Sequence, residues 1–139
     1  MIIYVTSGAG EGSTDISAFD AALMAAGIAD FNLINLSSII PEGSEVVAQR
    51  FKSKDEDYGN RLYVVLQRNI QNIPGREAWA GLGWTQDRSG RGFFVEHEAA
   101  GKKEIEKFIE DSLEDMKSRR LGEFGENKTL IRSSPRRIA

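Results

Sequence analysis

The sequence has 139 residues, of which 40% are hydrophobic, and its formal net charge is -3. This length supports one hydrophobic core and is short for two independently folded domains. The acidic balance argues against a general binder of nucleic acid or of an anionic membrane, because either partner requires a basic surface. There is no cysteine, and His97 is the single histidine. These counts exclude disulfides, iron–sulfur clusters, cysteine-based zinc sites and histidine-rich metal sites.

The amino terminus, MIIYVTSGAG, has too few successive apolar residues and no basic residue, so it does not match a signal peptide. No run in the chain reaches the about 20 apolar residues that span a bilayer. From the sequence alone we expect a soluble cytoplasmic protein.

The first elements are a strand, a glycine loop and a helix. β-Branched and aromatic residues at 2–6 predict a strand that ends at the glycines of residues 8–12. A helix follows, with a cap at one of residues 13–15 and a stop at Gly27. Its apolar positions at helical spacing are Ile16, Phe19 and Leu23.

Apolar runs dominate the middle of the chain. Residues 31–40 predict a buried strand that ends at the turn Pro41-Glu42-Gly43, and residues 62–66 predict another. Strand patterns at 78–85 and 92–98 flank a polar, turn-rich segment, so we expect a hairpin.

The carboxyl-terminal part contains the clearest amphipathic pattern. Residues 102–120 predict a helix, and its apolar face is formed by Ile105, Phe108, Ile109, Leu113 and Met116. Residues 129–131 could add an edge strand. Beyond it we expect a solvated tail that contains Ser133 and Ser134 and ends in the basic residues Arg132, Arg136 and Arg137. The whole pattern indicates a compact α/β domain whose sheet is covered by two helices.

The glycine loop GAGEG could place backbone amides around a phosphate, because it lies between a strand and a helix. It lacks the GxGxxG spacing and the GK[ST] signature, and Glu11 lies inside it. We therefore favour a tight turn over nucleotide binding.

The pair Ser37-Ser38 stands inside the apolar segment NLINLSSIIP. Hydroxyls flanked by Leu36 and by Ile39-Ile40 are expected to be at least partly buried, and an unpaired buried hydroxyl costs about 1–3 kcal/mol. The pair could bond to backbone at a strand end. Alternatively, a serine hydroxyl can attack the preceding carbonyl in a strained site. The resulting ester then eliminates to dehydroalanine, which hydrolyses to a pyruvoyl group.

The segments GAGEGST, AFDAAL, AGI and NLINLSSIIP together resemble the pyruvoyl-dependent arginine decarboxylase family. The resemblance is dense over residues 6–43. Beyond them, the hairpin and the region of Glu96 match in order and character. One departure is Pro41-Glu42-Gly43, where the family often has two prolines.

The resemblance implies that Ser38 becomes the pyruvoyl group and that the chain splits after Ser37 into a β chain, 1–37, and an α chain, 38–139. The pyruvoyl carbonyl would form a Schiff base with L-arginine and act as the electron sink when carbon dioxide leaves, with agmatine as product. Neither pyridoxal phosphate nor a metal is then expected. Two alternatives are another substrate, such as S-adenosylmethionine, and an uncleaved homologue without activity.

The resemblance also implies a fold and an assembly. The fold would be a single domain over 1–139 with a four-layer αββα sandwich. The assembly would be a homotrimer with its active sites between neighbouring subunits, or a dimer of such trimers.

Other site residues follow from the same likeness. Asn32 would hydrogen-bond near the scissile carbonyl, although it could simply cap a turn. Asp20, at the border of the apolar stripe of its helix, would bind the cationic end of the substrate, or else it is solvated.

A glutamate after a small or apolar run would donate the proton to the decarboxylated carbon. Glu96 and Glu98 are both candidates, because residues two apart in a strand share a face. The apolar residues at 93–95 favour Glu96. His97 points the other way and is interpreted as structural.

Overall fold

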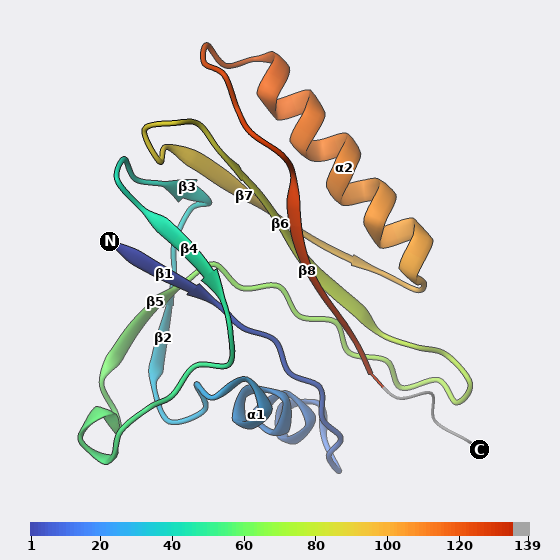
Figure 1. Ribbon diagram of the computed structural model, residues 1–139. Coiled ribbons are helices and arrows are strands. Elements are labelled where there is room, and N and C mark those ends of the chain that lie inside the picture. The colour runs from blue at the N-terminus through green and yellow to red at the C-terminus, as the bar shows by residue number, and fades with distance from the viewer. Residues whose placement is uncertain (135–139) are drawn as a thin grey trace.

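The computed structural model describes residues 1–134 and is built around a hairpin of two long strands, β6 (Trp79–Gln86) and β7 (Gly92–Ala99) (Figure 1). The hairpin expected from the sequence is confirmed. In its turn, one oxygen of Asp87 accepts hydrogen bonds from the Ser89 hydroxyl at 2.6 Å and the Ser89 amide at 2.8 Å. The hydroxyl contact is the main reason that the pKa of Asp87 lies below its ordinary value. Gly90 then reverses the chain at a φ of 91°.

The other elements complete one α/β domain, as the sequence predicts. In chain order they are β1 (Ile2–Val5), α1 (Asp15–Ala26), β2 (Asn32–Asn35), β3 (Ile39–Ile40), β4 (Glu45–Ala48), a 3-10 turn (Asp55–Asp57), β5 (Arg61–Val64), α2 (Lys102–Ser118) and β8 (Lys128–Ser133). The basic residues Arg136 and Arg137 lie outside the described residues. In the part of the chain that is described, no helix combines the length and the apolar character needed to cross a membrane.

The main sheet has the order β3-β7-β6-β8, and all of its pairs are antiparallel. Its edge strand β8 is longer than the strand expected at 129–131. The expectation of a solvated serine pair at 133–134 is wrong. Ser133 belongs to β8, and Ser134 exchanges two hydrogen bonds with the backbone of Ala78, at 2.8 and 3.0 Å. The pairing of β8 with β6 carries these serines into the sheet.

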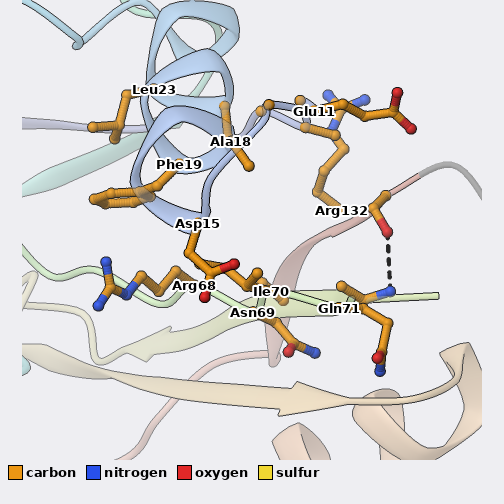
Figure 2. A pocket seen from close by; sticks show the side chains of 18 of the residues that line it. Glu11, Asp15, Ala18, Phe19, Leu23, Arg68, Asn69, Ile70, Gln71 and Arg132 are labelled. Carbon is orange, nitrogen blue, oxygen red and sulfur yellow. Dashed lines mark hydrogen bonds between the residues drawn. The ribbon is translucent and has the colours of Figure 1, made fainter. Parts of the chain in front are cut away.

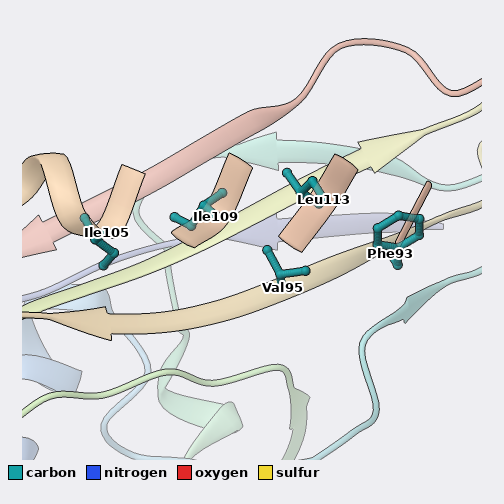
Figure 3. Packing of buried hydrophobic residues seen from close by; sticks show 5 residues of the cluster. All are labelled: Phe93, Val95, Ile105, Ile109 and Leu113. Carbon is teal, nitrogen blue, oxygen red and sulfur yellow. The ribbon is translucent and has the colours of Figure 1, made fainter. Parts of the chain in front are cut away.

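Helix α2 covers one face of this sheet (Figure 1). Ile105, Ile109 and Leu113 are fully buried and pack on Phe93 and Val95 of β7 (Figure 3). These three helix residues recur every four positions, so they form one stripe. The expectation that Phe108 joins this stripe is only partly met, because its side chain is 40% exposed at the edge of the contact.

The opposite face of the sheet packs on β1 and β4. The second core cluster is formed by Val5, Ile40, Trp84 and Phe94, with Val46 of β4 against it. In Figure 1 the strands β1 and β4 lie between the main sheet and α1. The short strands form two separate parallel pairs, β1 with β4 and β2 with β5. The four-layer sandwich as a whole stays a prediction.

Helix α1 begins and ends where the sequence predicts. The Thr14 hydroxyl oxygen accepts a hydrogen bond of 3.2 Å from the amide of Ser17. Gly27 adopts the left-handed conformation and ends the helix, and its amide donates to the carbonyl of Leu23. The predicted apolar stripe is wrong at Ile16, which is 78% exposed. The helix instead turns alanines toward the glycine loop, because only a small-residue face permits that close approach.

The expected single buried strand at 31–40 is wrong, because this segment divides into β2 and β3. The first pairs in parallel with β5 and the second antiparallel with β7, so the chain bends between them. Ile34, Leu36 and Ile39 are 37%, 52% and 62% exposed. A continuous apolar run was interpreted as burial on both faces, whereas nothing within the described chain covers the outer face here.

Gly83 lets α2 approach the sheet, since a Cβ at this position would lie 2.3 Å from Cγ2 of Ile109. Gly83→Ala must therefore displace the helix, and we expect a loss of about 1–3 kcal/mol in the free energy of unfolding, measured by urea denaturation. Gly125→Ala is the matched control, because its nearest neighbour would lie at 3.4 Å, in ordinary contact. Equal stabilities of the two variants would contradict this account of the helix–sheet contact.

Candidate active site

The Ser37-Ser38 pair lies at the bend between β2 and β3. Ser38 is partly buried, as expected, but the expectation for Ser37 is wrong, because Ser37 is exposed. The flanking residues Leu36 and Ile39 are themselves exposed and so give Ser37 no cover. The pair is therefore presented at a surface bend, with the second serine turned inward.

The Ser38 hydroxyl donates a hydrogen bond of 2.9 Å to Oε1 of Glu96. Glu96 is half-buried on β7, opposite Leu82. The next glutamate, Glu98, shares this face of the strand but is exposed. The structure thus places Glu96, and not Glu98, against the serine. A carboxylate at this distance is within reach to accept the hydroxyl proton.

The carbonyl of Ser38 is held as well, by the backbone amide of Phe94 at 2.7 Å. This contact continues the β3–β7 ladder, in which Ile39 is paired with Phe93 and Ile40 with Gly92. Both polar ends of Ser38 therefore bond to β7. The sequence pattern did not identify the amide of Phe94, because strand registers between distant segments are not visible in it.

Asn32 is not brought to Ser38 within the chain. Its side-chain amide donates to the carbonyl of Gly59 at 2.8 Å, in the turn that leads into β5. Asn32 begins β2 and Ser38 follows the end of that strand. At about 3.3 Å per residue, the strand alone separates its two ends by about 10 Å. In this geometry Asn32 fixes the start of the β2–β5 pair.

Asp20 is also apart from the serine pair. It is exposed on α1, and Figure 1 shows α1 and β3 toward opposite ends of the domain. His97 projects from the other face of β7, where its Nε2 lies 2.7 Å from the Ser112 hydroxyl and its ring packs on Phe108. These contacts agree with the structural interpretation of His97.

A separate cavity of about 230 Å³ lies between the glycine loop, α1 and the segment 66–72 (Figure 2). Neither Ser38 nor Glu96 lines it. Figure 2 shows Arg68 extending beneath the ring of Phe19, and its guanidinium carbon lies 4.7 Å from the ring centre. Asp15 at the start of α1 accepts a hydrogen bond from Asn72.

The loop glycines beside this cavity serve helix packing. A Cβ at Gly8 would lie 2.1 Å from the carbonyl oxygen of Ala22, and one at Gly10 would lie 2.6 Å from Cβ of Ala21. Close packing of the loop on α1 accounts for the glycines without a phosphate. Among residues 1–134 there is also no group of three or more His, Cys, Asp or Glu residues arranged to hold a metal ion.

These features define a class of protein. It is an α/β domain in which a serine hydroxyl and its own carbonyl are both held by one strand, with a carboxylate on the hydroxyl. This arrangement supports nucleophilic chemistry by the serine. It requires no contribution from the glycine loop.

Comparison with known proteins identifies the family. The family model described as pyruvoyl-dependent arginine decarboxylase matches residues 2–136. A protein of that name from Thermoplasma volcanium is 36% identical over 132 residues, which is 93% of this chain and 71% of that protein. One from Picrophilus torridus is 36% identical over 75% of this chain and 58% of its own length. A third, from Methanothermobacter thermautotrophicus, is 53% identical over a shorter stretch of 47 residues. The chain belongs to the pyruvoyl-dependent arginine decarboxylase family, which is a family of enzymes.

Proposed function

We propose that the chain cleaves itself between Ser37 and Ser38 and then, with a pyruvoyl group made from Ser38, decarboxylates L-arginine to agmatine and carbon dioxide. Family membership and the names of the relatives support the reaction. The observation that carries the proposal for this chain is the 2.9 Å hydrogen bond from the Ser38 hydroxyl to Glu96.

In the first step Glu96 takes the hydroxyl proton, and the Ser38 oxygen attacks the carbonyl carbon of Ser37. The peptide bond is replaced by an ester between Ser37 and the Ser38 oxygen. The proton passes from Glu96 to the nitrogen of residue 38, which becomes a free amino group. An elimination then breaks the bond between Cβ of residue 38 and the ester oxygen. It separates the segments 1–37 and 38–139 and leaves dehydroalanine at residue 38. Water converts this to the ketone, and ammonia leaves.

The surroundings of Ser38 fit the group that would form there. The pyruvoyl group supplies an electron-accepting carbonyl that is covalently part of the chain. Residue 38 would stay attached to β3, with its carbonyl on the amide of Phe94. Glu96 would lie beside it and is the proposed donor of the proton that replaces carbon dioxide.

Asp20 would bind the guanidinium of arginine by a bidentate ion pair. Because α1 and β3 lie apart in one chain, this role requires Asp20 of a neighbouring copy, as in the proposed trimer. A surface for such a neighbour is available beside the serine pair. The exposed apolar residues there are Ile34, Leu36, Ile39 and Tyr63. Exposed apolar groups gathered on one region are typical of an interaction surface.

The basic test is the mass of the purified chain under denaturing conditions. The unaltered sequence is expected to give two fragments, 1–37 and 38–139, whereas Ser38→Ala gives one intact chain without activity, because the attacking hydroxyl is absent. Ser133→Ala is the control and should cleave as the unaltered chain does. Fragments from Ser38→Ala at the same junction would contradict the assignment.

Replacing Glu96 tests its role as the base of self-cleavage. Glu96→Gln keeps a hydrogen-bond acceptor but accepts no proton, so we expect cleavage slower by about 10²-fold or more, followed as the loss of intact chain with time. Glu98→Gln has the same chemistry at an exposed position and should leave the rate unchanged. A Glu96→Gln chain that cleaves at the unaltered rate would exclude Glu96 as the base.

Asp20→Asn should cleave normally but bind arginine poorly. Loss of a charge-assisted pair worth about 1.5–3 kcal/mol corresponds to a KM raised about 10- to 100-fold, measured by release of labelled carbon dioxide. Asp30→Asn, at another exposed aspartate, is the control.

Mixing the Asp20→Asn and Ser38→Ala chains tests the origin of Asp20. If the site lies between copies, co-assembly restores tight arginine binding in some sites, since a processed residue 38 then meets an intact Asp20. Mixed assemblies in which every active site keeps the raised KM would place Asp20 and residue 38 in the same chain.

A further inference from the structure

The carbonyl of Ser38 belongs to the peptide bond between Ser38 and Ile39, which stays intact in the proposed cleavage. Its hydrogen bond to Phe94 is nevertheless shorter than the bond from the Ser38 hydroxyl to Glu96. The amide of Phe94 donates to this carbonyl at 2.7 Å, at the short end of the roughly 2.7–3.2 Å range of N–H···O bonds. Phe94 is 5% exposed, so this bond lies in partly dry surroundings. There a hydrogen bond is electrostatically stronger than in water.

The surrounding packing fixes the direction of this amide. Ile40 and Phe93 are each 1% exposed and hold β3 on β7 in one register. On its other side β7 pairs with β6. Gly92 permits the close approach of the two strands, because a Cβ there would lie 1.9 Å from the Thr85 carbonyl oxygen. Strand β3 lies after the scissile bond, so the contact between Phe94 and residue 38 does not depend on that bond.

We propose that the backbone amide of Phe94 stabilises the negative charge that forms on the Ser38 carbonyl oxygen during the elimination step of self-cleavage. This inference rests on the proposed function. In that step the Cα proton of residue 38 passes to Glu96, the carboxylate beside it. The electron pair forms the Cα–Cβ double bond, the bond from Cβ to the ester oxygen breaks, and Ser37 leaves as the carboxylate end of segment 1–37.

The Cα–H bond is weakly acidic, and the developing charge is delocalised onto the adjacent carbonyl oxygen. An amide already aimed at that oxygen requires no reorganisation when the charge appears. Glu96 therefore acts in both steps, because it takes the hydroxyl proton in ester formation and the Cα proton in the elimination. The amide of Phe94 acts in the elimination alone, where the charge forms on the Ser38 carbonyl oxygen.

Replacing Phe94 by phenyllactate keeps the ring and turns the amide N–H into an ester oxygen, which removes the donor and also makes the Phe93 carbonyl a weaker acceptor. We expect ester formation at residues 37–38 to continue and elimination to slow by about 10²-fold or more, as for loss of one oxyanion donor. The ester then accumulates. Hydroxylamine splits it and yields a segment that begins at residue 38 with an ordinary amino-terminal serine, whereas the unaltered chain yields a segment with a ketone at residue 38. Both products are identified by mass.

Phenyllactate at Phe51 is the matched control, because it removes a backbone bond from Phe51 to Ala26 of 3.3 Å with the same monomer. Hydroxylamine also cuts each introduced ester at its own position, which confirms incorporation. A Phe94 variant that forms the ketone at the unaltered rate would overturn the proposal. So would an intact Phe94 variant with no sensitive ester at residues 37–38. An unaltered chain that never splits would instead refute the proposed function.

A second measurement requires no variant at Phe94. Amide hydrogen exchange of Phe94 is followed by NMR in Ser38→Ala and in the cleaved chain. We expect slow exchange in both forms, because the bond to residue 38 precedes and outlasts the cut. Exchange at the rate of an open loop in either form would overturn the proposal. This test remains decisive even if the ester variant fails to fold.

Discussion

The pairing of β3 with β7 is the constraint on which the site depends. β3 has only two residues, Ile39 and Ile40, yet it places the preceding residue against two groups of β7. The amide of Phe94 holds the Ser38 carbonyl, and the carboxylate of Glu96 holds its hydroxyl. A shift of one residue in this register would turn every β3 side chain to the other face. It would also part Ser38 from both partners.

This register is stable because β7 is packed on both faces. Phe93 and Val95 pack on α2, whereas Phe94 packs with Trp84 and Ile40 on the side of β1 and β4. Glu96 continues the Phe94 face to the point where burial becomes partial. Because side chains alternate along the strand, Glu96 lies on the same face as Phe94, at the edge of the core. There it is half-buried and accepts the hydrogen bond of the Ser38 hydroxyl.

The two faces of the domain have different roles. On the α2 side Ile105, Ile109 and Leu113 are fully buried, and His97 contacts the helix through Ser112. On the side of the serine pair several large apolar residues are exposed. The proposed active site between two copies would account for both this surface and the exposed Asp20. The cavity beside α1 belongs to neither arrangement, since its glycines are explained by close packing against the helix.

Local chemistry in the sequence determined much of the fold. Thr14 and Gly27 bound α1, the polar turn defines the β6–β7 hairpin, and a four-residue repeat of isoleucine and leucine places α2 on the sheet. The segments GAGEGST, AFDAAL, AGI and NLINLSSIIP were together sufficient to assign the family. Tertiary structure alone decided the division of residues 31–40 into two strands and the exposure of Ser37. It also placed Glu96, which the sequence already favoured over Glu98, on the Ser38 hydroxyl. Caps, turns and helical repeats act within a few residues, so a sequence displays them directly. Strand registers join residues as distant as Ser38 and Phe94, and side-chain periodicity does not encode which distant strands meet.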